Sequence, residues 1–187
     1  MKIARRILVG LAGIIAILVV VGLFLPSSVH VERSAVINAP ATTVYGIVSD
    51  FSRFNEWSPW YDLDPGATYT ISKSSSGEGA TFAWQSDDPS VGSGSQQIIA
   101  LEENRLVRIK LDFGPQGIAM ASYALKAMGD ERSRITWTMD TDFGFDLFAR
   151  YIGLMFEAWV GADYERGLAK LKTVAEKDFP ATSDGDS

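Results

Sequence analysis

The 187-residue chain has no cysteine and a single histidine. The absence of cysteine excludes disulfide bonds, thiolate metal sites and a cysteine nucleophile. The lone histidine, His30, has no neighbouring metal ligand or catalytic partner in the sequence, so we interpret it as an exposed residue. Motifs of phosphate loops, dinucleotide-binding folds, zinc proteases and serine hydrolases are also missing. We therefore expect no cofactor and no metal site.

Acidic residues are absent from residues 1–28, which contain Lys2, Arg5 and Arg6. The rest of the chain has 14 Lys and Arg against 23 Asp and Glu, a net charge of −9. An acidic surface is repelled by phosphates, so we expect no nucleic-acid partner, and binding to anionic lipid is disfavoured as well. Solubility alone is a sufficient reason for such a charge.

Residues 7–25 contain no charge and no strongly polar group. As a helix rising about 1.5 Å per residue they would extend about 28 Å, close to the hydrocarbon thickness of a bilayer. Pro26 then ends the helix. A cleaved signal peptide is the alternative, but its apolar segment is usually about 7–15 residues long and ends at a small-x-small site. Ser27 and Ser28 do not form a clean site, so an uncleaved transmembrane helix is predicted.

The basic residues before this segment predict its orientation. Lysine and arginine next to a transmembrane helix stay on the cytoplasmic side. We therefore expect a cytoplasmic N-terminus and a domain on the outer, periplasmic or extracytoplasmic side. Three parts are predicted: a cytoplasmic stub with the anchor (1–28), one domain (29–177) and a disordered tail (178–187).

Period-two hydrophobic patterns predict a sheet in the domain. Short turns join most of the strands, which favours a meandering antiparallel arrangement. Between the first two strands, Asn38-Ala39-Pro40 is typical of a helix start, and we expect two short helices in 40–60. The strands are expected within 29–38, 67–74, 79–86, 95–101, 105–113, 120–128 and 134–141.

The C-terminal part predicts one long helix over residues 147–177. Its first half is apolar nearly all round, whereas its second half has a single apolar stripe that includes Tyr164 and Leu171. Gly153, Gly161 and Gly167 lie inside it, each costing about 1 kcal/mol relative to alanine. We predict a bend near Gly161 that re-aims the buried face.

Three segments resemble a known family: VINAPATTVYGIVSDFSRFNEWSPW (36–60), ITWTMDTDFG (135–144) and the aromatic C-terminal helix. They resemble the helix-grip fold of the START-like SRPBCC superfamily, whose members are often labelled polyketide cyclase/dehydrase. The resemblance covers about residues 29–176. It implies an α+β fold in which a curved antiparallel sheet wraps around a long C-terminal helix and leaves a cavity. The superfamily includes lipid carriers, small-ligand receptors and a minority of enzymes, and no catalytic residue set of theirs maps onto this sequence.

Large aromatic and methionine side chains are the expected lining of such a cavity, although the same side chains also fill ordinary cores. Tryptophan and tyrosine combine an apolar face with one hydrogen-bonding tip, which suits an amphiphilic ligand. The candidates are Trp57, Trp60, Phe82, Trp84, Phe113, Tyr123, Trp137, Met139, Met155 and Trp159.

Two groups of carboxylates are candidates for acid–base chemistry. Asp140 and Asp142 share one face of a strand, and they would form an acid–base pair only if that face pointed inward. Trp137 and Met139 are expected to point inward on this strand, so we predict that both aspartates point outward. For Glu157, on the long helix, a position at the rim of the cavity is favoured over one inside it.

Three functions remain for this sequence. The favoured hypothesis is a membrane-anchored module that binds a hydrophobic small molecule or lipid. A structural or interaction domain with a filled interior is the main alternative, and its protein partners cannot be inferred. A polyketide cyclase-like enzyme is the least favoured, because no catalytic constellation is evident.

Overall fold

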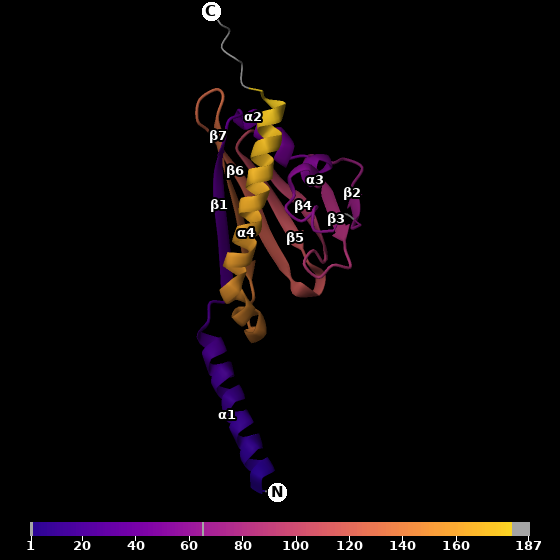
Figure 1. The fold of residues 1–187 in the computed structure, drawn as a ribbon. Coiled ribbons are helices and arrows are strands. Elements are labelled where there is room, and N and C mark those ends of the chain that lie inside the picture. Colours follow the sequence, from indigo (N-terminus) through magenta and orange to yellow (C-terminus); the bar gives the residue numbers. More distant parts are fainter. Residues whose placement is uncertain (1, 65, 181–187) are drawn as a thin grey trace, which may run out of the picture.

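Seven antiparallel strands form one curved sheet in the computed structural model, which describes residues 2–64 and 66–180 (Figure 1). The strands lie in the order β1-β7-β6-β5-β4-β3-β2, so only the pairing of β1 with β7 joins strands distant in sequence. All seven predicted strands are present, with shifted ends. They are β1 (Ser28–Ile37), β2 (Thr68–Ile71), β3 (Thr81–Gln85), β4 (Ser93–Glu102), β5 (Leu106–Asp112), β6 (Ile118–Ala127) and β7 (Ser133–Asp142).

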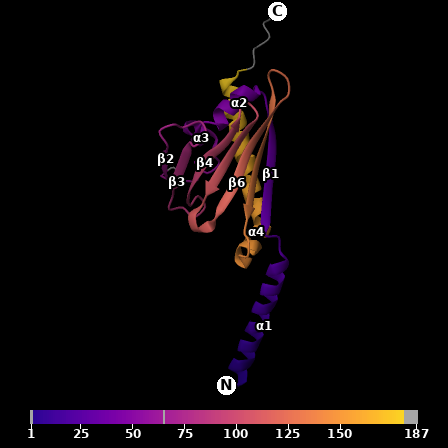
Figure 2. The same ribbon diagram turned by 180° about the vertical axis from the view of Figure 1, so that it is seen from behind.

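A long helix and two short ones cover the concave face of the sheet (Figures 1 and 2). Together with the sheet they confirm the α+β helix-grip fold. Pro40 precedes the first turn of α2, and the Asp50 carboxylate accepts a hydrogen bond from the Ser52 amide at the next helix start. The helical elements are α1 (Lys2–Phe24), α2 (Ala41–Val48), η1 (Phe51–Arg53), α3 (Phe54–Trp57), η2 (Gly114–Gln116) and α4 (Leu147–Asp178). Of the predicted tail, Asp178 belongs to α4, and residues 181–187 lie outside the described part.

One face of α4 packs along β1, and Tyr164 and Gly167 of the same face contact Trp137 of β7. At 100° per residue the buried residues of α4 fall on one face and form a single stripe: Arg150, Gly153, Gly161, Tyr164, Gly167, Leu168, Leu171 and Ala175. The predicted re-aiming of the buried face at Gly161 is therefore wrong. The glycines act as spacers instead, because they let the helix backbone approach bulky side chains of the sheet and of its connections. Gly161 lies against the Arg33 guanidinium, and Gly153 lies against the Phe143 ring.

The spacer role can be tested at Gly167, where an added Cβ would lie 2.8 Å from Trp137 Cζ3 and 3.1 Å from Pro59 Cδ. Both neighbours are rigid, so Gly167→Ala should lower the free energy of unfolding by about 1–3 kcal/mol. Gly46→Ala is the matched control, since nothing lies within 4 Å of a Cβ there. The control should raise stability by about 0.5–1 kcal/mol through helix propensity alone. Denaturant unfolding of the full chain in detergent measures both, and equal effects of the two substitutions would contradict the spacer role.

The N-terminal helix α1 extends from the end of the domain where β7 joins α4 (Figure 1). Only residues 25–27 separate α1 from β1. Gly22 is the one described residue of α1 that is buried, and a Cβ there would lie 3.2 Å from Tyr151 Cε2 and 3.4 Å from Leu147 Cβ. α1 is long and apolar enough to cross a membrane, and a signal sequence near the N-terminus meets the same criteria. We call the end of the sheet at Ser28 and Asp142 the α1 end, and the opposite end the far end.

Candidate functional site

Five of the ten candidate residues are buried, with at most 4% of each side chain exposed: Trp57, Phe82, Tyr123, Trp137 and Met139. Several of them form a compact aromatic cluster. The Trp57 ring centroid lies 5.3 Å from that of Trp137 and 5.6 Å from that of Tyr123, both edge-on. The other face of Trp137 stacks on Tyr164 of α4 at 3.7 Å. This part of the space between sheet and helix is therefore filled with protein side chains.

The two tyrosines of the cluster are not suited to acid–base chemistry. Burial raises the pKa of the Tyr123 phenol well above its ordinary value, and it does the same for the pKa of Tyr164. Burial disfavours the phenolate because the charge would lose its hydration. Both side chains are therefore neutral over the physiological pH range.

Three candidates are partly buried. Trp60 donates a hydrogen bond from Nε1 to Asp163 Oδ2 of α4 at 3.1 Å. Trp84 and Phe113 lie at the α1 end, where their rings meet edge-on at 5.9 Å. Trp84 also rests on Gly94, where a Cβ would lie 2.7 Å from its Cζ2 atom. The glycine thus allows a large indole to lie flat against β4.

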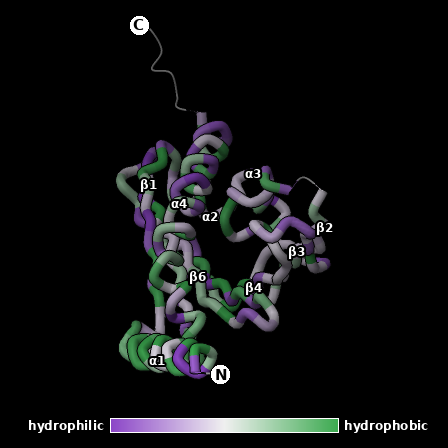
Figure 3. The backbone as a smooth tube through the Cα atoms, turned by 60° about the horizontal axis from the view of Figure 1, so that its bottom comes forward, coloured by the Kyte–Doolittle hydropathy of each residue, from purple (hydrophilic) through white to green (hydrophobic). Residues whose placement is uncertain are grey.

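The sheet register defines which side chains line the α1 end. One row of inward-facing side chains crosses the sheet next to Trp84 and Phe113: Phe82, Gln96, Leu111, Ala119 and Thr141. Ala119 contributes only a methyl group to this row, and Ala121 does the same in the row behind it. Leu111 of this row is only partly buried, as is Phe156 of α4. Sheet, α3 and α4 surround the interior when the molecule is viewed from the α1 end (Figure 3).

We call Trp84, Leu111, Phe113 and Phe156 the mouth residues. All four pack against the core, yet each keeps part of its surface accessible. The aromatic cluster behind them is almost fully buried. The α1 end therefore combines buried members of this row with four large apolar side chains that keep part of their surface exposed.

Gln96 is a polar residue that sequence reasoning missed. Its side chain is 3% exposed, and Nε2 has no hydrogen-bond partner among the described residues. An unpaired buried N–H costs about 1–3 kcal/mol, and Nε1 of Trp57 and Nε1 of Trp137 are buried and unpaired in the same way. The signal in the sequence was weak, namely one glutamine in an inward register position, two residues before Ile98.

The remaining candidates, Met155 and Trp159, lie on the outer face of α4 and are about half exposed. The stripe that includes Gly153 and Gly161 occupies the face toward the sheet, so these large side chains point away from the interior. They are not brought together with the mouth residues.

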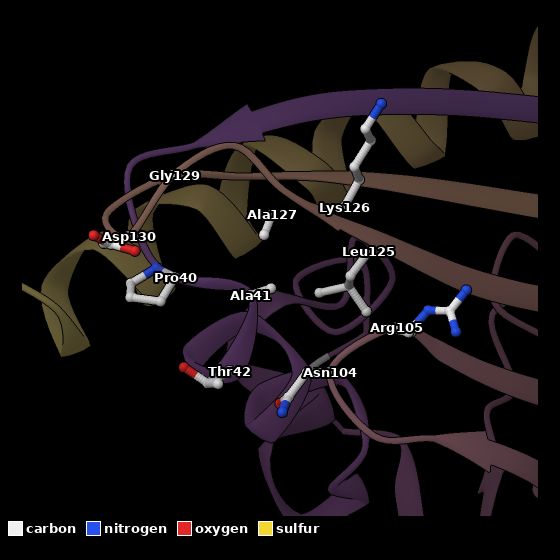
Figure 4. Close-up of a pocket in the computed structure, with 10 residues that line it drawn as sticks. All are labelled: Pro40, Ala41, Thr42, Asn104, Arg105, Leu125, Lys126, Ala127, Gly129 and Asp130. Atoms are coloured by element: carbon white, nitrogen blue, oxygen red, sulfur yellow. The ribbon is translucent and has the colours of Figure 1, made fainter.

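Two hollows on the described surface lie elsewhere. The larger has a volume of about 890 Å³ and lies at the far end, between the start of α2 and the turns after β4 and β6 (Figure 4). It is lined by Pro40, Ala41, Thr42, Asn104, Arg105, Leu125, Lys126, Ala127, Gly129 and Asp130. The other, of about 510 Å³, is lined by polar residues that include Asp64, Asp87 and Asp88. Neither is situated between the sheet and α4.

Asp140 and Asp142 point away from the interior, as predicted. The Asp140 carboxylate forms a hydrogen bond with the exposed His30 ring, with 2.7 Å between Oδ1 and Nδ1. Asp142 accepts a hydrogen bond from the Gly144 amide at 2.7 Å. Glu157 is half exposed and pairs with Arg33 at 2.9 Å. These three carboxylates are therefore engaged on the outside of the domain.

The His30–Asp140 pair makes a testable prediction, because a single histidine gives unique NMR ring signals. The hydrogen bond to Asp140 raises the pKa of His30 above its ordinary value of 6.5. Asp140→Asn should lower that pKa, whereas the control Asp142→Asn should leave it unchanged. The pair therefore stabilises the fold below about pH 6.5, and this contribution is lost as pH rises through the folded-state pKa. Both side chains are more than half exposed, so the effect on stability should be only a few tenths of a kcal/mol. If the pKa of His30 is at or below 6.5 and does not change in the Asp140→Asn variant, the assignment of the pair is refuted.

The sheet, the long helix and the aromatic interior define the class of this protein as an α+β helix-grip domain. Within that class the chain belongs to the family described as "Polyketide cyclase / dehydrase and lipid transport", whose model matches residues 28–176. The family points to a ligand-binding domain of the polyketide cyclase/dehydrase type.

Individual relatives are distant. The chain is similar to "Ribosome association toxin RatA" of Pseudomonas aeruginosa, with 26% identity over 132 residues that cover 69% of this chain and 85% of that protein. A solution NMR structure of a protein from Thermobifida fusca has a TM-score of 0.62 at 18% identity, covering 79% of this chain and 93% of that one. The ZhuI aromatase/cyclase from Streptomyces sp. R1128 has a TM-score of 0.58 at 18% identity, covering 83% and 98%. The structural likenesses establish the fold.

Proposed function

We propose that this protein is a membrane-anchored module that binds a hydrophobic small molecule or lipid between the sheet and α4. One observation carries the proposal: at the α1 end, the partly exposed Trp84, Leu111 and Phe113 lie in and beside the sheet row that contains Gln96, whose Nε2 has no partner among the described residues. An apolar wall with a single polar group is typical of small-molecule sites. The ligand class that fits is an apolar body carrying one acceptor oxygen, such as a carboxyl, carbonyl or hydroxyl group.

The contacts of Arg150 support an uncleaved anchor. Arg150 is 9% exposed, although it lies in the most apolar part of α4. Its Nη1 donates to the carbonyl oxygens of Leu23 and Leu25, both at 3.3 Å, and its Nε donates to Gly144 O at 2.9 Å. Carbonyl groups at a helix C-terminus lack intrahelical partners, and a cation there is favourable. Removal of α1 would therefore leave a buried guanidinium without two of its acceptors.

The basic residues that precede α1 place the domain on the outer side of the membrane in this proposal. A tethered binding module fits that arrangement, since the tether keeps the site close to lipid. Enzymatic function receives little support, because the inward-facing titratable groups are neutral tyrosines. The filled aromatic cluster favours a second candidate, an interaction domain that holds no ligand.

Photo-crosslinking distinguishes the two candidates. The full chain in phosphatidylcholine nanodiscs would be irradiated with a fatty acid that carries a diazirine, and the modified peptides would be mapped by mass spectrometry. Ligand binding predicts modification of peptides that contain the mouth residues, saturating with concentration. Modification confined to α1, which contacts lipid in either case, would contradict binding and favour the interaction domain.

Gln96 supplies a sharper test within the same experiment. Gln96→Leu should reduce crosslinking at the mouth residues by roughly two- to tenfold, because one hydrogen bond contributes about 0.5–1.5 kcal/mol. It should not destabilise the fold, since it removes an unpaired buried amide. Gln97→Leu is the matched control, because Gln97 follows on the same strand and faces the opposite side of the sheet. If the Gln96→Leu and Gln97→Leu variants are crosslinked equally, Gln96 does not contact the ligand.

A further inference from the structure

The outer face of α4 has an apolar stripe made of Phe148, Ile152, Met155 and Trp159, which we call the outer stripe. Its members recur every three or four residues on the face opposite the sheet, and their exposed fractions are 76%, 37%, 47% and 53%. Phe145, just before the helix, is 90% exposed. Contiguous large apolar side chains on a soluble surface mark an interaction site.

The outer stripe contains no available charge. Three charged residues occur within residues 145–162, and each is engaged away from the outer stripe. Asp146 caps α4 by accepting from the Ala149 amide at 3.0 Å, Arg150 binds the end of α1, and Glu157 pairs with Arg33. The outer stripe ends one turn beyond Trp159, where Asp163 and Arg166 form an ion pair. At about 1.5 Å per residue it is about 16 Å long.

Contacts with α1 fix where the outer stripe lies. Tyr151 donates a hydrogen bond from its hydroxyl group to the Leu18 carbonyl oxygen at 2.7 Å. Leu18 is seven residues before Leu25, the end of the apolar segment, which corresponds to about 10 Å along the helix. A bilayer that covers the apolar segment of α1 therefore also reaches the first turns of α4. The three-residue connection to β1 and the Arg150 contacts keep the domain from moving away.

We propose that the outer stripe and Phe145 insert into the outer leaflet of the membrane, so that the domain is docked on the bilayer instead of hanging from a flexible tether. This inference rests on the proposed anchoring by α1. The bilayer is the occupant because the outer stripe is continuous with α1 and because tryptophan is favoured at the membrane–water interface. Apolar insertion drives the docking, since the chain after the anchor has a net charge of −9 and gains nothing from anionic lipid. Docking places the mouth residues, which lie at the α1 end, next to lipid.

The absence of cysteine makes a site-specific test possible. Single cysteines at Phe148 and Met155 would carry an environment-sensitive nitrobenzoxadiazole label in the full chain, reconstituted in phosphatidylcholine vesicles. Thr173→Cys is the matched control, because Thr173 is exposed on the same helical face as Met155, five turns further along α4. Docking predicts several-fold stronger quenching by spin-labelled lipid at Phe148→Cys and Met155→Cys than at Thr173→Cys. Aqueous cobalt should give the opposite order.

Ile15→Cys, in the middle of α1, separates failure of the docking from failure of the anchor. Lipid quenching at Ile15→Cys with aqueous quenching at Met155→Cys would overturn the docking and leave the anchor intact. Aqueous quenching at both positions would overturn the anchor as well. A Met155→Cys label shielded from both quenchers would assign the outer stripe to a protein partner and would also overturn the proposal. All four substituted side chains are exposed, so the variants are expected to fold.

Discussion

The close approach of α4 to strands β1 and β7 is the constraint on which the other features depend. It requires residues without a side chain where the helix passes over Phe143, Arg33 and Trp137, and glycines occupy those three positions. The approach brings Tyr164 onto the face of Trp137, which completes the aromatic cluster. It also turns the large apolar residues of the first half of α4 away from the sheet.

The resulting molecule has two different ends. In the middle of the sheet the aromatic cluster fills the space between sheet and helix, so no ligand is required for stability there. At the α1 end the sheet rows contain small residues, and the mouth residues are only partly covered. Arg150 joins that same end to α1. The mouth residues, the N-terminal helix and the outer stripe are therefore neighbours, which is the arrangement expected of a domain that exchanges an apolar ligand with a membrane.

The fold was largely predictable from the sequence, because each strand shows period-two alternation and the segment 36–60 carries a recognisable family pattern. The site was less predictable. Residues 147–160 are apolar nearly all round, so periodicity could not show that Trp159 faces outward. The glycines of α4 predict a bend when only the sequence is considered, because a sequence does not reveal which side chain of the sheet lies opposite a missing Cβ. Gln96 and Arg150 were missed because their roles depend on unpaired and long-range hydrogen bonds.

The central claim is that the interior at the α1 end holds an apolar molecule with one acceptor group. Native mass spectrometry of the full chain, purified from its host in nanodiscs and released in the gas phase, tests it most directly. We predict a single co-purifying molecule at close to one per chain, lost or reduced in Gln96→Leu but retained in Gln97→Leu. A chain that is always released without a bound molecule, in both variants and in the unmodified protein, would contradict the account.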